Sequence, residues 1–396
     1  MRRIHFATLA IGLCATASAA PNWYYEYEGA TITDLLTLPG DSWSIAYDIN
    51  NNGKVVGDSG NGTKTRAFLY TSGMTTVPLG AYVANSHARG INDNNEFVGY
   101  LHWTLDPPYV DRGWYSALFL GTGLHLQSNP QAPLSYNWSM RAYAINNSGV
   151  IVGGGVMDFE SSDDPIPDTQ GDCYSELPVR WGSASAQAEM LFCPADLPNA
   201  VQTIAYDINN NGDTVGVDNG TTSLRMFLEK SGASVQSVPG PPGALSGTAF
   251  GLSNGGHVTG MFNSGSNYRA FYWNGTSATA FDLGIMPGGN ISMGKEVNDQ
   301  GFVAGYSTFQ WNPPLGSGPV TRRAAFIWGP NIGMVTLPSL GTPYWTWNNC
   351  EANALNNRVD ATGRIQVVGY CETGGEKRAV RWNVTVARKI GGVLQP

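Results

Sequence analysis

Residues 46–57 read Ala46-Tyr47-Asp48-Ile49-Asn50-Asn51-Asn52-Gly53-Lys54-Val55-Val56-Gly57. The pattern Ala-x-x-Ile-Asn-x-x-Gly-x-Val-x-Gly occurs seven times, with changes, in copies that begin at Ala46, Ala88, Ala142, Ala205, Ala249, Gly294 and Ala352. The copies start 42, 54, 63, 44, 45 and 58 residues apart. The short intervals indicate a unit of 42–45 residues, and the longer ones contain insertions. Self-similarity at this period is typical of a repeat architecture.

Each unit contains four short apolar runs separated by turn residues. In the first unit one run ends at residue 49, a second begins at 55, and the others cover 66–70 and 75–79. The Asn-Asn-Gly and Ser-Gly segments between them favour tight turns. Runs of β-branched and aromatic residues between such segments are typical of strands, and no long stretch has the period of a helix. The sequence therefore predicts an all-β fold with four strands per repeat.

Four strands at this repeat length match one blade of a β-propeller. Seven repeats predict a single seven-bladed β-propeller domain over residues 20–396, in which ring closure removes exposed sheet edges. The run Thr31–Leu36 resembles the fourth strand of a unit but precedes the first full copy. We therefore expect this N-terminal strand to pair with the last blade and close the ring. A β-solenoid and a two-sheet assembly are the alternatives.

The first nineteen residues have the pattern of a cleaved secretory signal peptide. Arg2 and Arg3 precede an apolar segment at 6–14 and the small residues Ala17-Ser18-Ala19, which is the order of such a signal. We expect a bacterial protein that is secreted or periplasmic. No later stretch approaches the ~20 apolar residues of a membrane span, so we expect no membrane insertion.

The charge balance argues against nucleic acid as a partner. The formal net charge is −8 and only 13% of residues are charged. Nucleic acids and anionic membrane surfaces both require a basic face. The sequence therefore favours an extracellular polysaccharide or a protein as partner, and we expect a monomer.

Four cysteines remain after signal removal: Cys173, Cys193, Cys350 and Cys371. An even count in an exported chain predicts disulfides. Of the three possible connectivities, the repeat register favours Cys173–Cys193 and Cys350–Cys371. The cysteines lack the close spacing typical of a metal site.

No metal or other cofactor is expected, and calcium is the alternative. The segments Asp48–Gly53 and Asp207–Gly212 match the first half of a calcium-binding loop. A further carboxylate should follow the glycine, but Val56 and Val215 occupy the key position. Asn side chains that hold a tight turn explain the same pattern without metal.

The long connectors are predicted on one face of the ring, called here the insertion face. They are the second-to-third connectors at 100–115, 154–177 and 306–322 and the blade-to-blade connector at 341–351. Loops on a rigid scaffold often carry function. Trp and Tyr side chains there suit sugar rings or protein hot spots, and packing of loop against loop is the alternative. The candidate ligand-binding residues are Trp103, Trp114, Trp311, Tyr344, Trp345 and Trp347.

One group on the insertion face could support catalysis: His102, Tyr109, Arg112 and Tyr115. A His or Tyr base, with an Arg to neutralise a carboxylate, is what β-elimination on a uronic-acid polysaccharide requires. A glycosidase would need two carboxylates about 5–10 Å apart, and nothing in the sequence selects a pair. The sequence has no Gly-x-Ser-x-Gly, phosphate-binding or zinc-protease motif.

The hairpin Ile-Asn-x-x-Gly-x-Val-x-Gly, followed by x-Ala-Phe-x-Trp/Tyr, resembles the HAF family of extracellular repeats. The family is named after His-Ala-Phe in the third strand, and Arg replaces the His here, as in Arg66-Ala67-Phe68 and Arg269-Ala270-Phe271. The resemblance covers residues 31–382 and implies an exported β-rich repeat protein, without an agreed biochemical role. The replacement removes this position as a candidate metal-binding or catalytic His.

Together these observations predict a secreted, non-catalytic propeller that binds an extracellular polysaccharide or protein through the aromatic-rich insertion face. The alternatives are a polysaccharide-degrading enzyme acting at the same face, a lyase rather than a glycosidase, and a surface scaffold with no single ligand.

Overall fold

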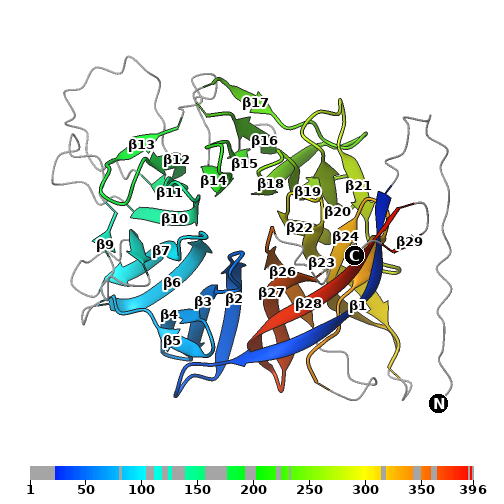
Figure 1. Cartoon of the computed structure of the whole chain (residues 1–396), viewed down its shortest axis with the longest axis horizontal. Coiled ribbons are helices and arrows are strands. Elements are labelled where there is room, and N and C mark those ends of the chain that lie inside the picture. Colours follow the sequence, from blue (N-terminus) through cyan, green and yellow to red (C-terminus); the bar gives the residue numbers. More distant parts are fainter. Residues whose placement is uncertain are drawn as a thin grey trace.

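The chain is a seven-bladed β-propeller. The computed structural model describes residues 23–79, 83–103, 111–117, 124–126, 139–156, 176–191, 202–219, 224–231, 233–313, 318–341, 349–357, 364–390 and 393–394. Within those ranges there is no helix, and the strands form seven antiparallel blades around a central axis (Figure 1). The predicted all-β, seven-bladed architecture with four strands per repeat is confirmed.

In blades 1 to 6 the strands follow one another in chain order from the axis outward. Blade 1 consists of β2 (Trp43–Ile49), β3 (Val55–Asn61), β4 (Lys64–Tyr70) and β5 (Met74–Thr76). Blade 2 consists of β6 (Val83–Ile91), β7 (Glu96–Trp103), β8 (Asp111–Ala117) and β9 (Leu124–His125), and blade 3 of β10 (Ser139–Ile145), β11 (Ile151–Val156), β12 (Glu176–Trp181) and β13 (Ala188–Met190). Blade 4 consists of β14 (Gln202–Ile208), β15 (Thr214–Asn219), β16 (Leu224–Glu229) and β17 (Val235–Ser237), and blade 5 of β18 (Ser246–Leu252), β19 (Val258–Asn263), β20 (Tyr268–Trp273) and β21 (Phe281–Gly284). Blade 6 consists of β22 (Ser292–Val297), β23 (Val303–Trp311), β24 (Val320–Gly329) and β25 (Gly333–Thr336).

Blade 7 joins the two ends of the chain. Its strands are β26 (Cys350–Leu355), β27 (Arg364–Thr373), β28 (Glu376–Ile390) and, outermost, β1 (Trp23–Leu36), and the short β29 (Val393–Leu394) also pairs with β28. Thr31 pairs with Asn383 and Ile32 with Trp382. The predicted closure of the ring by the N-terminal strand is confirmed, and Figure 1 shows the blue β1 beside the red β28.

The innermost strand of every blade contains a β-bulge at the same repeat position. The last glycine of the motif lies on the neighbouring strand, opposite the residue that precedes the bulge. A Cβ atom at Gly57 would lie 2.1 Å from the Ile45 carbonyl oxygen, and in the other six blades the equivalent distance would be 1.8–1.9 Å. Only glycine permits this approach of two backbones, which explains the final Gly of the repeat.

An aromatic ring of the third strand lies opposite that glycine in five blades. The rings belong to Phe68, Trp114, Phe227, Phe271 and Phe326, and each is buried between blades. Trp114 was predicted to be an exposed ligand platform, and this prediction is wrong because its ring is fully buried in the core. The space left by Gly99 on the neighbouring strand accommodates it.

The Asn residues of the turns tie neighbouring blades together. The backbone N–H of the residue after the motif Asn donates to the side-chain Oδ1 of its counterpart in the next blade, at 2.7–3.0 Å. The seven bonds run Asn51→Asp93→Asn147→Asn210→Asn254→Asp299→Asn357→Asn51 and close a circle. We call this circle the inter-blade belt, and it lies on the face opposite the insertion face.

The motif Asn residue holds its own turn as well. The Oδ1 atom of Asn50 accepts from the backbone N–H groups of Asn52 and Lys54, and its Nδ2 donates to the Asn92 carbonyl at 2.9 Å. Gly53 completes the turn with φ of 73°, a conformation that Asn95 adopts in blade 2. In the described residues, no group of three or more His, Cys, Asp or Glu side chains could hold a metal ion.

Breaking one bond of the belt should weaken the fold measurably. In Asn210→Ala the Oδ1 that accepts the Asn147 N–H is lost, and we expect the free energy of unfolding to fall by about 0.5–1.5 kcal/mol. Asn210→Asp is the matched control, because it keeps the acceptor and Asp already serves at positions 93 and 299. Denaturant titration measures both variants, and an equal loss in both would contradict this role.

Candidate functional site

The bulged residues of the seven inner strands line the propeller axis. We call them the axial ring, and they are Tyr47, Arg89, Tyr143, Tyr206, Phe250, Lys295 and Asn353. The Arg89 guanidinium lies 3.8 Å from the Tyr47 ring centroid. The Tyr206 ring lies 5.9 Å from that of Tyr143 and 5.2 Å from that of Phe250. Neighbouring blades therefore meet at the axis through aromatic rings and cations.

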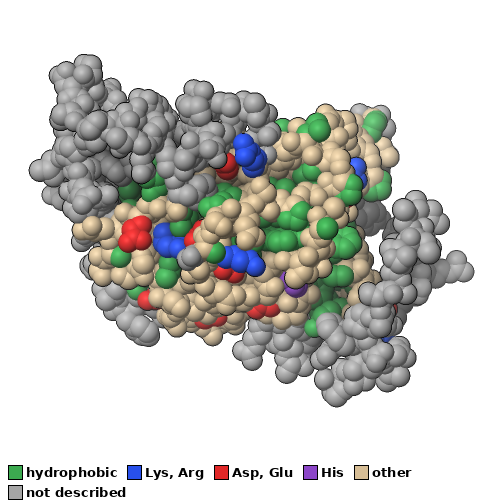
Figure 2. Space-filling model, turned by 90° about the horizontal axis from the view of Figure 1, so that it is seen from above, with side chains coloured by type: hydrophobic (Ala, Val, Ile, Leu, Met, Phe, Trp, Pro, Cys, Tyr) green, Lys and Arg blue, Asp and Glu red, His purple; other side chains and the backbone are tan. Residues whose placement is uncertain are grey.

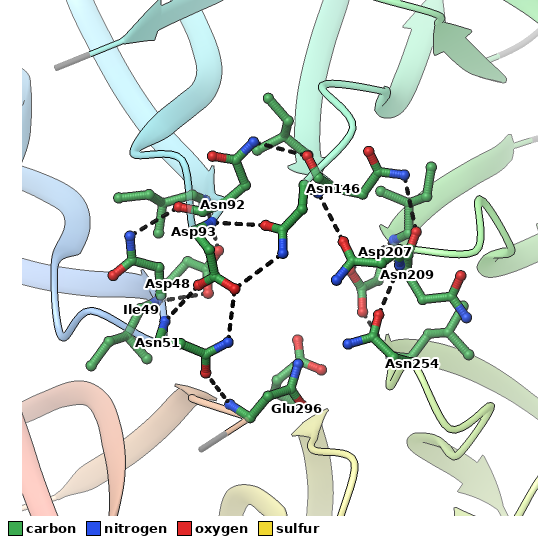
Figure 3. Close-up of a pocket in the computed structure, with 18 of the residues that line it drawn as sticks. Asp48, Ile49, Asn51, Asn92, Asp93, Asn146, Asp207, Asn209, Asn254 and Glu296 are labelled. Carbon is green, nitrogen blue, oxygen red and sulfur yellow. Dashed lines mark hydrogen bonds between the residues drawn. The ribbon is translucent and has the colours of Figure 1, made fainter. Parts of the chain in front are cut away.

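A polar cavity of about 110 Å³ lies on the belt side of the axial ring. Three carboxylates enter it from different blades, namely Asp48, Asp207 and Glu296, as Figure 3 shows. They occupy the repeat position next to the bulge, where the other copies have Gly or Ala. Asp93 also lines this axial acidic pocket, and no Lys, Arg or His is among the described residues of its lining.

Burial dominates the titration of these acids. It raises the pKa of Asp48 and of Asp207 to about 7, although each carboxylate accepts two backbone N–H groups that oppose the shift. The pKa of Glu296 is raised well above its usual value, first by burial and then by the charges of Asp207 and Asp48. The side chains keep some exposed surface toward the cavity while protein surrounds them on the other sides. The pocket therefore retains protons at mildly acidic pH.

A second cluster lies between the axial ring and the insertion face, in blades 1 and 2. His87 Nδ1 lies 2.8 Å from Asp58 Oδ2, and Arg89 donates to the same oxygen at 3.0 Å and to the Tyr100 hydroxyl at 2.9 Å. The His87 and Tyr100 rings are stacked with centroids 4.6 Å apart. We call Asp58, His87, Arg89 and Tyr100 the upper cluster. Asp58 is buried and fixes the orientation of both the His87 and the Arg89 side chains.

His102 is the predicted site residue that joins the upper cluster. Its half-buried ring meets that of His87 edge-on, with centroids 5.8 Å apart, and lies 6.3 Å from that of Tyr100. The Arg141 guanidinium lies 5.5 Å from the Tyr100 ring centroid. Imidazole, phenol and guanidinium groups thus gather here.

Tyr115 does not join His102, so the predicted convergence is wrong for this residue. Tyr115 pairs with Val98, whereas His102 pairs with Asp111 near the other end of the blade. The Tyr115 hydroxyl donates to Glu96 at 2.8 Å, and burial raises its pKa to about 12. It is therefore unsuited to act as a base beside His102.

Other predicted residues lie partly or wholly outside the described residues. Trp103 and Arg112 belong to β7 and β8, but their side chains are outside the described part. The signal peptide at 1–19, Tyr109, Tyr344, Trp345, Trp347, Cys173 and Cys193 lie wholly outside it. Trp311 is the last residue of β23, half-buried, with the Arg322 guanidinium 5.7 Å from its ring centroid.

Blades 6 and 7 carry a third polar group near the insertion face. Arg323 forms ion pairs with Glu351 and Glu372, and Tyr370 also bonds Glu351. Burial raises the pKa of Tyr370. The predicted disulfide lies next to this group. It joins Cys350 on β26 to Cys371, its cross-strand partner on β27.

The charges are sparse on the side of the ring that Figure 2 presents. Figure 2 shows Lys, Arg, Asp and Glu side chains singly or in small groups among uncharged surface on the face that it presents. Among the described residues, no helix is long and apolar enough to cross a membrane.

Comparison with known proteins supports the fold. No protein-family model matches the chain, and no curated protein matches it. A puromycin-hydrolyzing peptidase of Mycobacterium tuberculosis is similar in structure, with 11% identity and a TM-score of 0.50 over 91% of this chain and 56% of that chain. Trypanosoma rangeli sialidase in complex with the inhibitor DANA matches with 10% identity and a TM-score of 0.40 over 90% and 60%. The chain spans only 56–60% of the length of these two structures, and at 11% identity the likeness to the peptidase shows the fold alone.

Proposed function

We propose that this protein is an exported, non-catalytic binding module that takes up an extracellular saccharide at the upper cluster, on the insertion-face side of the axial ring. The observation that carries the proposal is the gathering of His87, Tyr100 and His102 around Arg89. Aromatic rings with polar edges offer a flat apolar surface to a sugar ring and hydrogen-bonding atoms to its hydroxyls. Binding sites on rigid strands need little reorganisation when a ligand arrives.

Two features support export. The N-terminal residues have the pattern of a signal peptide. The Cys350–Cys371 disulfide fits an oxidising compartment, since cytosolic thiols are kept reduced.

A second candidate function is β-elimination on a uronic-acid polysaccharide at the same cluster, and the Asp58–His87 pair favours it. Asp58 holds the Nδ1 side of the imidazole, and in the described part of the chain Nε2 has no hydrogen-bond partner. A base held this way could take the proton next to the substrate carboxylate as a C=C bond forms and the glycosidic C–O bond breaks, and the leaving oxygen takes a proton from solvent water. His87 then replaces His102 as the proposed base.

The test incubates the protein with a panel of neutral and acidic polysaccharides and scores retention and unsaturated products together. We expect retention without products, and His102→Ala should weaken binding about two- to tenfold, since a ring contact is worth about 0.5–1.5 kcal/mol. Phe281→Ala, which removes an exposed ring on the outer strand of blade 5, is the control and should bind normally. Products that His87→Ala abolishes would establish the lyase instead, and neither retention nor products would refute both functions.

A further inference from the structure

Lys295 is a cation of the axial ring that has no counter-ion of its own. Its Nζ lies 5.0 Å from the Phe250 ring centroid. Within the described residues the ammonium group has no hydrogen bond and no ion pair. Protein surrounds it, and this burial lowers the pKa of Lys295 against the opposing charge of Glu351. The Lys295 side chain nevertheless keeps some exposed surface.

The carboxylates of Glu351 and Glu296 are committed to other partners. Glu351 pairs with Arg323 and receives the Tyr370 hydroxyl. Glu296 follows Lys295 directly but lines the axial acidic pocket on the other side of the ring, where it accepts the Val297 N–H at 2.9 Å. Neither carboxylate is therefore the partner of Lys295.

An enclosed ammonium group without a counter-ion destabilises the folded protein, because the loss of its hydration is not offset by an ion pair or hydrogen bond. A single cation–π contact offsets about 0.5–2 kcal/mol, which is less than burial of a charge costs. A bound anion would supply the missing partner through a charge-assisted hydrogen bond. The axial ring therefore offers a site for a carboxylate.

Aromatic rings connect Lys295 with the upper cluster. The Tyr143 ring lies 6.4 Å from that of Tyr100, and Tyr206 and Phe250 continue the series to Lys295. A ligand that reaches from the upper cluster to Lys295 would meet flat rings along this path. Sugar rings bind such surfaces.

We infer that the saccharide is acidic: a uronic acid residue places its carboxylate on Lys295 and its sugar ring against Phe250 and Tyr206. This inference rests on the proposed function and adds the chemical class of the ligand. The upper cluster binds the neutral hydroxyls of the saccharide, whereas Lys295 selects saccharides that carry a carboxylate.

The test compares the affinity of a short galacturonic-acid oligomer with that of its fully methyl-esterified form, by calorimetry. The native protein should prefer the acid about 10- to 100-fold, as expected for a bond to a charged group, and Lys295→Met should remove the preference while it keeps affinity for the ester. Lys377→Met is the matched control, because Lys377 also lies over an aromatic ring, 4.5 Å from the Tyr370 centroid, beside the β27–β28 turn. It should keep the preference.

Folding is checked by the melting temperature, which Lys295→Met should not lower because an unpaired enclosed charge is removed. Equal binding of acid and ester by the native protein, or a preference that survives Lys295→Met, overturns the inference and leaves saccharide binding intact. If neither oligomer binds, the proposed function fails. Acetylation of Lys295, followed by mass spectrometry with and without sodium glucuronate, then decides the carboxylate site: protection supports it and unchanged reactivity overturns it.

Discussion

A chain that lacks β1 (Trp23–Leu36) is expected to lose the stable ring. Without β1 the long edge of β28 is left unpaired, and the side chains that pack beneath it are exposed. Leu35 is 2% exposed, and Ala30 and Ile32 pack on the core cluster that contains the buried Trp382. Burial of one large apolar side chain contributes about 1.5–3 kcal/mol, and a whole domain is stable by only about 5–15 kcal/mol.

The measurement is the thermal unfolding of the shortened chain by circular dichroism, together with size-exclusion chromatography. We expect loss of the cooperative transition and self-association through the bare β28 edge, which offers unpaired N–H and C=O groups. A chain that ends at residue 390 is the control, because it lacks only the two-residue β29 among the described strands of blade 7. An unchanged melting temperature after removal of β1 would show that six complete blades and a three-stranded seventh suffice.

Most of the fold could be predicted because each blade repeats one local pattern. The motif Asn binds both its own turn and the next blade, as Asn50 does with Lys54 and Asn92. The same Asn therefore indicates both the tight turn and the contact between neighbouring blades, and its recurrence in the repeats makes the pattern recognisable in the sequence. The N-terminal strand was recognisable because residues 31–36 resemble a fourth strand that lacks a blade of its own.

The site is harder to predict from the sequence, and for Trp114 the decisive pattern is the alignment of its strand with that of another repeat. Arg112-Gly113-Trp114 aligns with Arg66-Ala67-Phe68, and this alignment places Trp114 at the buried aromatic position. Tyr115 follows it on a strand that runs away from the insertion face. Proximity to His102 in the sequence therefore did not mean proximity in space.

The axial residues could not be predicted for a different reason. Lys295 and Glu296 are neighbours in the sequence, yet the bulge sends one to the axial ring and the other to the axial acidic pocket. Asp48 was interpreted as part of a turn that resembled a calcium loop. Its true environment includes Asp207, 159 residues later in the chain, and only ring closure brings the two together.

These acids lead to a pH dependence of opposite sign to ordinary acid denaturation. The folded-state pKa of Asp48 and Asp207 is about 7 and that of Glu296 is also raised, whereas unfolded carboxyls titrate near pH ~4. Between pH ~4 and ~7 these carboxyl groups thus keep their protons in the folded state but have released them in the unfolded state. Their contribution to stability is therefore fully present below pH ~4, is lost as the pH rises toward ~7, and stays lost above it.

Glu296→Gln isolates this contribution. Its carboxylate uses one oxygen to accept the Val297 N–H, which an amide oxygen can still do. Asp48→Asn is less suitable, because the two oxygens of Asp48 accept from Ile49 and Ile91 and an amide has only one acceptor. At pH 8 we expect Glu296→Gln to be more stable than the native protein by about 1–3 kcal/mol, because one charge facing Asp48 and Asp207 is gone.

The measurement is denaturant unfolding of both proteins from pH 3 to pH 8. At pH 3 the two free energies of unfolding should nearly coincide, since the Glu296 carboxyl group is then protonated in both the folded and the unfolded chain. Glu376→Gln, at the exposed β27–β28 turn, is the control and should follow the native protein at every pH. A difference between Glu296→Gln and the native protein that does not change with pH would contradict a raised pKa of Glu296 in the folded protein.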